Sequence, residues 1–295
     1  RRRLRMAARR MLICWAVGLV IWVWSTACGR ISESRWLRLD VLDVGHGDSV
    51  VIRTPRGRTL VVDAGTEEAG RYRVAPFLRH AGVRALDALV LTHTDEDHIG
   101  GALPLLQQFS VGRLLTNGVA GATMSARRIY RVAAEAEVPR TVLASGMTLG
   151  DEAGVEITVL HPPRGLVPGV GPASNDNSVV LRVTKGEISV LLCGDIEEAG
   201  LPWLIGQASA VRARVLKVPH HGSRLGEAGE RFFDAVRPEI AILSVGRLHH
   251  LPSPQTVEAL ARRGVRLYST RTDGAISLRT DGRRLEVRAF RNSKF

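Results

Sequence analysis

Cysteine, lysine and aromatic residues are scarce in this sequence, and the shortage excludes several kinds of protein. The 295 residues include three cysteines, with no C-x-x-C and no paired spacing. Neither a disulfide framework nor a thiolate zinc cluster is therefore supported. Aromatic residues make up only 5%, which fits a loop-rich α/β protein better than a helical bundle. Because tandem repeats and low-complexity linkers are also missing, the length indicates one large domain with a short appendage.

Lysine occurs only three times, so almost all of the positive charge comes from arginine. The net charge is +12, but residues 1–38 contain nine arginines and one glutamate, which leaves about +4 for the rest. Arginine is well suited to phosphate because its guanidinium forms two parallel hydrogen bonds. A general compositional bias toward arginine explains the same numbers, so charge alone does not identify a nucleic-acid-binding protein.

Residues 11–28 form an apolar run without a charge, and six arginines precede it. At about 1.5 Å per residue, such a run can just cross a hydrocarbon core of about 30 Å. We predict that residues 1–30 are a basic flank and a transmembrane helix, with the rest of the chain on the outer, extracytoplasmic side of the inner or plasma membrane. A cleaved signal peptide, or a lipoprotein signal ending at Cys28, shares the same features and remains an alternative.

The rest of the sequence alternates between strand and helix patterns in two similar halves. In the first half we expect strands at 36–44, 49–54, 59–65, 88–92 and 113–116, with helices at 74–81, 100–109 and 125–137. In the second half we expect strands at 155–160, 178–184, 188–192, 215–218 and 240–244, helices at 229–236 and 254–263, and closing strands at 266–268, 275–279 and 285–289. Two β-rich halves with outer helices predict two sheets packed face to face between helical layers.

The strongest local pattern is L-T-H-T-D-E-D-H-I-G-G, which follows a short apolar strand. It places His93, Asp95, Asp97 and His98 within six positions of one loop. Imidazoles and carboxylates on a loop at a strand end can converge on one cleft, and these are the ligands that transition metals use in proteins. The pattern therefore predicts a metal site.

Two further strand ends carry residues of the same kind. Asp195 follows the apolar strand 188–192, where it is either a ligand or the N-cap of a helix at 196–204. His220 and His221 follow the strand 215–218. We expect one of these imidazoles to bind metal, and the other to act on the substrate or to support a ligand.

These motifs together resemble a known family. With D-V-G-x-G-D-S and D-A-G upstream, and C-G-D and P-H-H-G-S downstream, the sequence resembles the metallo-β-lactamase superfamily over about residues 37–290. More narrowly it resembles the C-terminal domain of ComEC-type DNA-uptake (competence) proteins. The resemblance implies a four-layer αββα hydrolase domain at 36–295 and two divalent metal ions, zinc or manganese. It also implies nuclease activity on DNA, which we expect to be single-stranded, next to a DNA-translocation channel.

The resemblance also assigns roles to individual residues. His93 and Asp95 match ligands of the first metal, Asp97, His98 and one histidine of the 220/221 pair match ligands of the second, and Asp195 matches the bridging carboxylate. We take His220 as that ligand. Its neighbour His221, together with Asp97, Asp195 and His220, is expected to take part in catalysis. Either histidine of the pair, or His250 of a late His-Pro loop, would protonate the leaving oxygen.

The chain departs from the family pattern at two places. A further histidine ligand is missing from residues 174–178, where Asn175 or Asp176 would substitute. Such an oxygen-rich pocket makes manganese a competitor to zinc. The usual Gly-Gln-Gly-Asp-Ser contains His46, whose role is open. We expect Asp48 to lie behind the ligands or near the substrate, and Asp63 to orient a metal-binding imidazole.

Two other functions remain compatible with these residues. A secreted or lipid-anchored hydrolase of small esters, lactones or phosphodiesters would use the same ligands, and a charge of about +4 on the domain suits it. A DNA-binding module without turnover would explain the missing histidine. Both stay open at this point.

Overall fold

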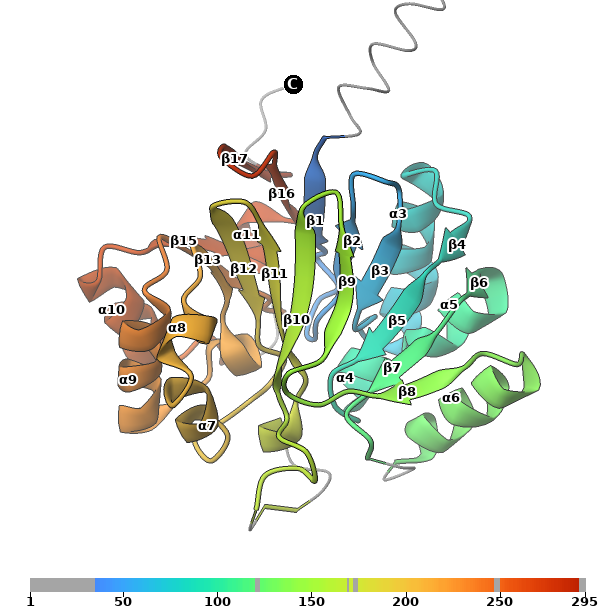
Figure 1. Ribbon diagram of the computed structural model, residues 1–295, viewed down its shortest axis with the longest axis horizontal. Helices are drawn as coiled ribbons and strands as arrows, with labels where there is room; N and C mark the ends of the chain where they lie inside the picture. Colours follow the sequence, from blue (N-terminus) through green and yellow to red (C-terminus); the bar gives the residue numbers. More distant parts are fainter. Residues whose placement is uncertain (1–34, 120–122, 169, 172–174, 247–249, 292–295) are drawn as a thin grey trace, which may run out of the picture. The chain divides into compact units, whose positions relative to one another are not determined.

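Two β-sheets dominate the computed structural model, which describes residues 35–119, 123–168, 170–171, 175–246 and 250–291 (Figure 1). They belong to one unit that begins at Leu37. The predicted transmembrane segment lies outside the described residues. Among the helices that are described, none combines the length and the apolar character that crossing a membrane requires.

The first sheet has eight strands and combines the start and the end of the described chain. Its order is β17 (Leu285–Ala289), β16 (Ile276–Thr280), β1 (Leu37–Val41), β2 (Val50–Arg53), β3 (Thr59–Val62), β5 (Ala88–Leu91), β7 (Leu114–Thr116) and β8 (Arg140–Val142). From β17 to β3 the neighbours are antiparallel, whereas from β3 to β8 they are parallel. The meander predicted for residues 36–65 is confirmed.

The second sheet has seven strands and is mixed in the same way. Its order is β15 (Arg266–Ser269), β14 (Ile240–Leu243), β13 (Val215–Lys217), β12 (Ile188–Leu192), β11 (Val180–Lys185), β10 (Val155–His161) and β9 (Thr148–Glu152). The strands from β12 to β15 are parallel. A separate short pair joins β4 (Ala85–Leu86) to β6 (Ser110–Val111).

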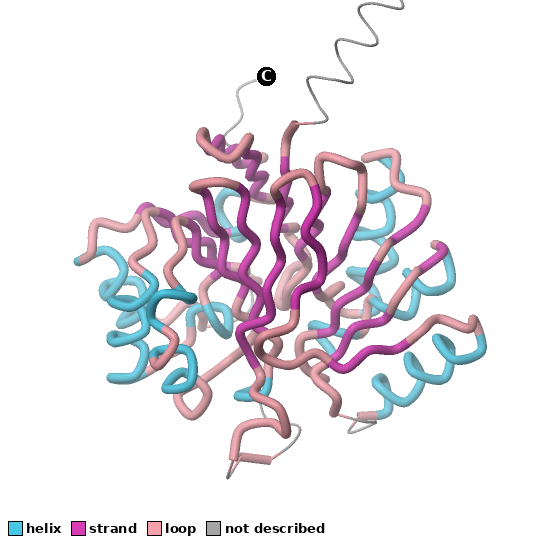
Figure 2. Tube along the Cα trace, in the orientation of Figure 1, coloured by secondary structure: helices cyan, strands magenta, loops and turns pink. Residues whose placement is uncertain are grey.

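Helices cover the outer face of each sheet (Figure 2). On the first sheet lie α2 (Glu67–Ala69), α3 (Ala75–His80), α4 (Glu96–Ile99), α5 (Ala102–Gln108) and α6 (Met124–Glu135); the others are α7 (Leu201–Ile205), α8 (Ala208–Val211), α9 (Gly226–Val236), α10 (Pro254–Arg262) and α11 (Thr270–Asp273). The helix predicted at 125–137 begins one residue earlier because Thr123 caps it, accepting a hydrogen bond from the Ala126 amide.

Three apolar cores follow from this layering. One core lies between the sheets and contains side chains of both, such as Val62 and Val190. The second packs the first sheet against α3, α5 and α6, and the third packs the other sheet against α7, α9 and α10. The predicted α/β fold with helices outside two facing sheets is therefore confirmed.

Candidate metal centre

The predicted ligands lie where parallel strands of both sheets end. The chain leaves β5 at Leu91 to enter the His93–His98 loop, leaves β12 toward Asp195, and leaves β13 toward His220 and His221. Because parallel strands present their carboxyl ends at one edge of a sheet, side chains that follow them gather there. A hydrogen bond of 2.9 Å from the Val179 amide to the Thr92 carbonyl ties the two edges together.

Four donor atoms converge in what we call the closed pocket: Asp97 Oδ2, His98 Nε2, Asp195 Oδ2 and His221 Nε2. Both imidazole nitrogens lie 3.2 Å from Asp195 Oδ2, and they are 3.3 Å apart. Asp97 Oδ2 lies 3.6 Å from the His221 nitrogen and 4.0 Å from the His98 nitrogen. His98, Asp195 and His221 are buried, and Asp97 is 26% exposed.

These separations fit a single cation. A tetrahedral ion with bonds of about 2.1 Å has ligand atoms about 3.4 Å apart. The observed distances between donor atoms, from 3.2 to 4.0 Å, lie on both sides of that value. Two nitrogens and two carboxylate oxygens in this geometry are a donor set for zinc and for other divalent transition metals.

Hydrogen bonds behind the closed pocket fix the tautomer of each imidazole. His98 Nδ1 lies 2.8 Å from Asp63 Oδ2, and His221 Nδ1 lies 3.0 Å from the Ser244 carbonyl oxygen. A carboxylate and a carbonyl only accept hydrogen bonds, so each Nδ1 carries a proton, and each Nε2 can present its lone pair to a cation once its own proton is released. Asp63 therefore occupies the orienting position that the sequence predicts for it.

Asp48 approaches the closed pocket from behind. Asp48, His98, Asp195 and His221 place donor atoms within 4.8 Å of one another. The Asp48 carboxylate, however, forms a buried ion pair of 2.6 Å with Lys217, and its other oxygen lies 3.6 Å from Nδ1 of His221. Since Nδ1 is on the far side of the ring from Nε2, we interpret Asp48 as a partner of Lys217 and a support for His221.

Two further donor pairs flank the closed pocket, and we call their residues the open pocket: His93 with Asp95, and His220 with Asp195. His93 Nε2 lies 3.7 Å from Asp95 Oδ2, and His220 Nε2 lies 3.8 Å from Asp195 Oδ2. His93 Nε2 and Asp195 Oδ1 are buried and have no hydrogen-bond partner among the described residues. Buried polar atoms without partners are costly, and a cation would satisfy both.

The open-pocket imidazoles are oriented like those of the closed pocket. The Thr92 hydroxyl donates a hydrogen bond to Asp63 over 2.6 Å, so its oxygen accepts a hydrogen bond from His93 Nδ1 at 3.0 Å. Nδ1 of His220 lies 2.5 Å from Glu197 Oε1. Each ring thus directs its Nε2 lone pair inward.

Charge in the metal-free centre is balanced by protons. Burial lowers the pKa of His221, but the charges and hydrogen bonds of Asp195, Asp97 and Asp48 together outweigh it and raise the pKa to about 9. The pKa of His98 also rises, because burial is again outweighed by Asp195 and Asp63. Burial raises the pKa of Asp195, but the two imidazoles bring it well below its usual value. Protons thus hold the place that a divalent cation takes when it binds.

The structure corrects two of the sequence-based assignments. His221, and not His220, lies in the closed pocket beside Asp195, whereas the sequence-based assignment placed His220 there. The helix after Asp195 begins only at Leu201 with Gly200 as its cap, so the N-cap alternative for Asp195 is wrong.

Three other predicted residues lie outside both pockets. Asp176 Oδ1 accepts hydrogen bonds from the Glu197 and Gly200 amides, so it supports the Asp195 turn and does not replace a histidine ligand. Asn175 forms a hydrogen bond with Glu197. His250 is exposed and belongs to neither pocket, and residues 247–249 lie outside the described residues.

Sequence reasoning missed three residues of the centre. It did not find Glu197 behind His220, it did not find Lys217 beside Asp48, and it left His46 without a role. Glu197 and Lys217 each lie within four positions of a predicted ligand, so position relative to the motif is the only signal they give. Their contacts depend on the turns that follow the strands.

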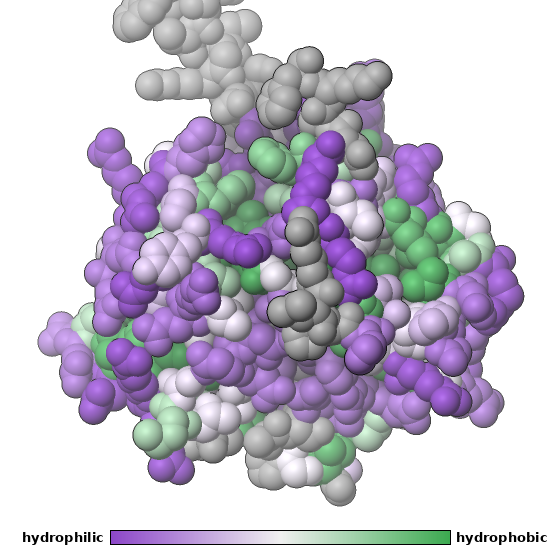
Figure 3. Space-filling view, turned by 180° about the vertical axis from the view of Figure 1, so that it is seen from behind, coloured by the Kyte–Doolittle hydropathy of each residue, from purple (hydrophilic) through white to green (hydrophobic). Residues whose placement is uncertain are grey.

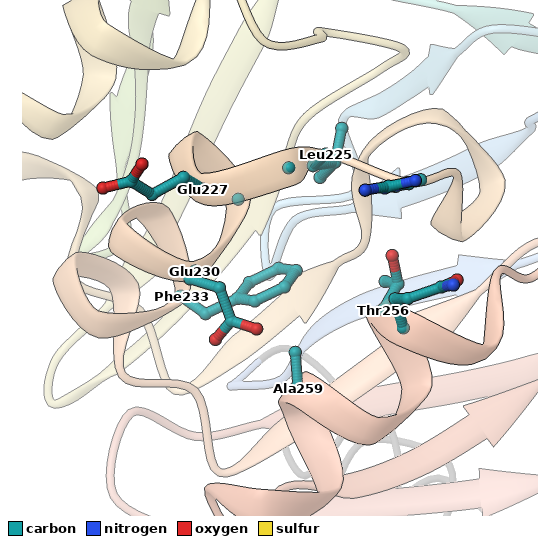
Figure 4. A pocket seen from close by; sticks show the side chains of 10 residues that line it. Leu225, Glu227, Glu230, Phe233, Thr256 and Ala259 are labelled. Carbon is teal, nitrogen blue, oxygen red and sulfur yellow. The ribbon is translucent and has the colours of Figure 1, made fainter.

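A cavity of about 360 Å³ lies away from this centre, between α9 and α10. Figure 4 shows Phe233, Thr256 and Ala259 facing one another there, with Glu227 directed away. None of the residues lining this cavity belongs to either pocket. On the face opposite to that of Figure 1, hydrophilic residues cover most of the surface, and apolar residues form only scattered groups (Figure 3).

Comparison with known proteins agrees with the fold. The chain is 33% identical to ComE operon protein 3 of Bacillus subtilis over 83% of its length, and 32% identical to Competence protein ComA of Neisseria gonorrhoeae over 89%. It spans only about a third of either relative. The similarity to ComEC-type competence proteins that the motifs predict is therefore confirmed.

Solved structures show the same fold at low sequence identity. The metallo-beta-lactamase fold protein YhfI from Bacillus subtilis matches with a TM-score of 0.54 and 12% identity, over 81% of this chain and 99% of its own. CmlA, a diiron beta-hydroxylase from Streptomyces venezuelae, matches with a TM-score of 0.52 and 17% identity, over 83% of this chain and 54% of its own. The sequence profile of the metallo-beta-lactamase superfamily matches residues 42–247, and the chain belongs to that superfamily.

Proposed function

We propose that the chain is a two-metal phosphodiesterase that cleaves DNA. The observation that carries the proposal is the convergence of imidazoles from both pockets on the Asp195 carboxylate, whose Oδ2 also lies 3.8 Å from His220 Nε2. Oδ2 lies 3.2 Å from two imidazole nitrogens, and Oδ1 is buried without a hydrogen-bond partner among the described residues. A carboxylate in this position can bridge two cations.

Each residue of the centre has a defined task in this proposal. When bound, two divalent cations would neutralise phosphate oxygens and acidify a water molecule. The oriented Nε2 atoms of His98 and His221 would hold one cation, together with Asp97 and Asp195. His93, Asp95 and His220 would hold the other. The exposed carboxylate of Asp95, 47% accessible, marks the side from which substrate approaches.

The choice of DNA rests on the relatives. One of them is named Competence protein ComA, another is ComE operon protein 3, and a third, 30% identical over 89% of this chain, is Recombination protein 2 of Haemophilus influenzae. Phosphodiester cleavage also suits a pair of cations, because in-line displacement needs charge stabilisation on both the attacking and the leaving oxygen. We propose single-stranded DNA as the substrate.

We further propose that the domain acts at the outer face of a membrane, beside a DNA-translocation channel. The uncharged run at 11–28 with its preceding arginines supports this placement. A reporter fused after residue 295 that is active only outside the cytoplasm should be active in cells. A reporter active only in the cytoplasm would contradict the proposal.

The function can be tested with the full chain purified in a mild detergent. We expect end-labelled single-stranded DNA to be cleaved when Mn²⁺ or Zn²⁺ is added, and to stay intact with excess chelator. The same assay is run on His93→Ala and Asp195→Ala, with Asp234→Ala on the exposed face of α9 as the matched control.

Each alternative function gives a different result. Hydrolysis of small esters or phosphodiesters, with DNA left intact, would replace the nuclease by a small-substrate hydrolase. Binding of DNA without cleavage under either metal would indicate a DNA-binding module. Cleavage that survives in Asp195→Ala would contradict the proposed centre.

A further inference from the structure

The Gly45–Asp48 loop carries an imidazole that the metal centre described so far does not use. The loop connects β1 to β2 and brings His46 to the mouth of the closed pocket. His46 Nε2 lies 3.5 Å from Asp97 Oδ2, and the His46 ring lies 4.5 Å from the ring of His221, centre to centre. The His46 and Asp97 side chains are 24% and 26% exposed, so both face the solvent side of the pocket.

The backbone on both sides of His46 leaves it little freedom. Gly47 has a φ of +108°, and a Cβ at this position would lie 1.9 Å from the Asp97 carbonyl oxygen. On the other side, a Cβ on Gly246 would lie 2.7 Å from the His46 amide nitrogen. Such close approaches are possible only for glycine. His46 is therefore held between the ligand loop of the first sheet and the loop that follows β14 in the second.

The donor atoms around His46 also have the spacing of metal ligands. His46, Asp97 and His221 place donor atoms within 4.8 Å of one another. Ligands at about 2.1 Å from one ion lie between about 3.0 Å and 4.2 Å apart when the ion is five-coordinate. The 3.5 Å between His46 and Asp97 falls within this range.

We propose that His46 is a fifth ligand of the closed-pocket cation. This inference rests on the proposed metal-binding function. It gives the closed pocket three imidazoles against two carboxylates, whereas the open pocket has two of each. Nitrogen donors favour zinc over harder ions such as manganese. The closed pocket is thus the zinc-selective half of the centre, and manganese enters the open pocket.

Metal binding itself tests the proposal. The full chain in mild detergent is stripped of metal, and Zn²⁺ binding is measured by calorimetry for the wild type, His46→Gln and the matched control His80→Gln, an exposed histidine at the end of α3. Loss of a residue that merely orients a ligand weakens metal binding about 10–100-fold. We therefore expect His46→Gln to lose at least about tenfold in affinity at one of two sites, with the control unchanged.

A spectroscopic readout distinguishes a ligand from a neighbour. Co²⁺ absorbs visible light more strongly in tetrahedral than in five-coordinate sites. Removing a fifth ligand should therefore increase the absorption of the Co²⁺-loaded chain in His46→Gln and leave His80→Gln like the wild type. Gly246→Ala, which displaces the His46 backbone but keeps the imidazole, should weaken Zn²⁺ binding in the same direction. Melting of the metal-free variants shows that they are folded.

The outcomes separate this inference from the function on which it rests. Unchanged Zn²⁺ affinity and an unchanged Co²⁺ spectrum in His46→Gln would overturn the fifth ligand and leave the two-metal centre standing. A wild-type chain that binds no divalent metal would overturn both.

Discussion

The closed and the open pocket share Asp195 but differ in how completely the folded chain prepares them. In the closed pocket, donor atoms from both sheets already lie 3.2 to 4.0 Å apart, and three of the four residues are buried. In the open pocket the two measured pairs are 3.7 and 3.8 Å apart, and Asp95 is 47% exposed. A preorganised donor set loses less freedom on binding. We therefore predict that the closed pocket binds a cation more tightly than the open pocket.

Removing the shared carboxylate should have the largest effect. In Asp195→Ala both pockets lose a donor, so we expect metal content by mass spectrometry to fall from two ions toward none. Because two cations supply several kcal/mol of transition-state stabilisation, kcat/KM on DNA should fall at least about 10³-fold. A variant that keeps two ions would show that the pockets do not share Asp195.

Exchanging the two neighbouring histidines tests the contrast between the pockets directly. His221→Ala should remove the tight site and leave a weak one, because it opens the closed pocket. His220→Ala should remove the weak site and leave the tight one. Zn²⁺ titration of both variants measures the affinity that survives. Equal residual affinities would mean that the pockets are equivalent, contrary to their geometry.

The carboxylate behind the closed pocket should have a smaller effect. Asp63 adopts a φ of +55°, a conformation that asparagine tolerates well. Asp63→Asn therefore keeps the backbone but weakens the orientation of His98, and we expect Zn²⁺ affinity to fall about 10–100-fold. Glu197→Gln is the corresponding variant for the open pocket, because Glu197 lies beside Nδ1 of His220. Asp63 also accepts the Thr92 hydroxyl behind His93, so in Asp63→Asn we expect a smaller loss at the open pocket, which the Thr92 hydroxyl relays. An equal loss at both sites would contradict the direct action on His98.

A buried imidazole outside both pockets, His161, should affect the pH dependence of stability in the direction opposite to His221. His161 Nδ1 donates to the Ser178 carbonyl over 2.8 Å, and burial lowers the His161 pKa to about 4, whereas that of His221 rises to about 9. Between pH 6.5 and 4 the unfolded chain binds more protons at His161 than the folded chain. Stability is therefore lost as pH falls through this range, by at most about 1.4 kcal/mol per pH unit.

His161→Gln provides the comparison, because its amide can still donate to Ser178. Urea unfolding of the metal-free chain at several pH values should show a shallower loss of stability in the variant between pH 6.5 and 4. His221 has a raised pKa, so its contribution is present below pH 6.5 and is lost as pH rises through about 9. Identical slopes for wild type and variant would contradict the buried neutral His161.

The strands that carry the centre were predictable from sequence because their apolar patterns are strong. β5, β12 and β13 are buried along their length, and each is followed at once by ligand-type residues. The edge strands β8 and β9 were missed. β8 is largely exposed, and β9 contains a glycine and two carboxylates, so neither has the apolar alternation of an internal strand.

Within the centre, residue types were predictable but their division between the pockets was not. His220 and His221 adopt positive φ values of 43° and 53°, so the chain turns sharply between them. The resulting directions of the two rings depend on this turn and not on any periodic pattern. His46 likewise depends on two glycines that are far apart in sequence, Gly47 and Gly246, which pack against different neighbours.

The placement of the ligands has a mechanical consequence for the whole domain. Asp97 and His98 come from the first half of the chain, whereas Asp195 and His221 come from the second. A bound ion would thus form a reversible cross-link between the two halves, whose described residues include a single cysteine, Cys193. Metal supply would then govern how long the domain survives heat or proteases, as well as whether it turns over substrate.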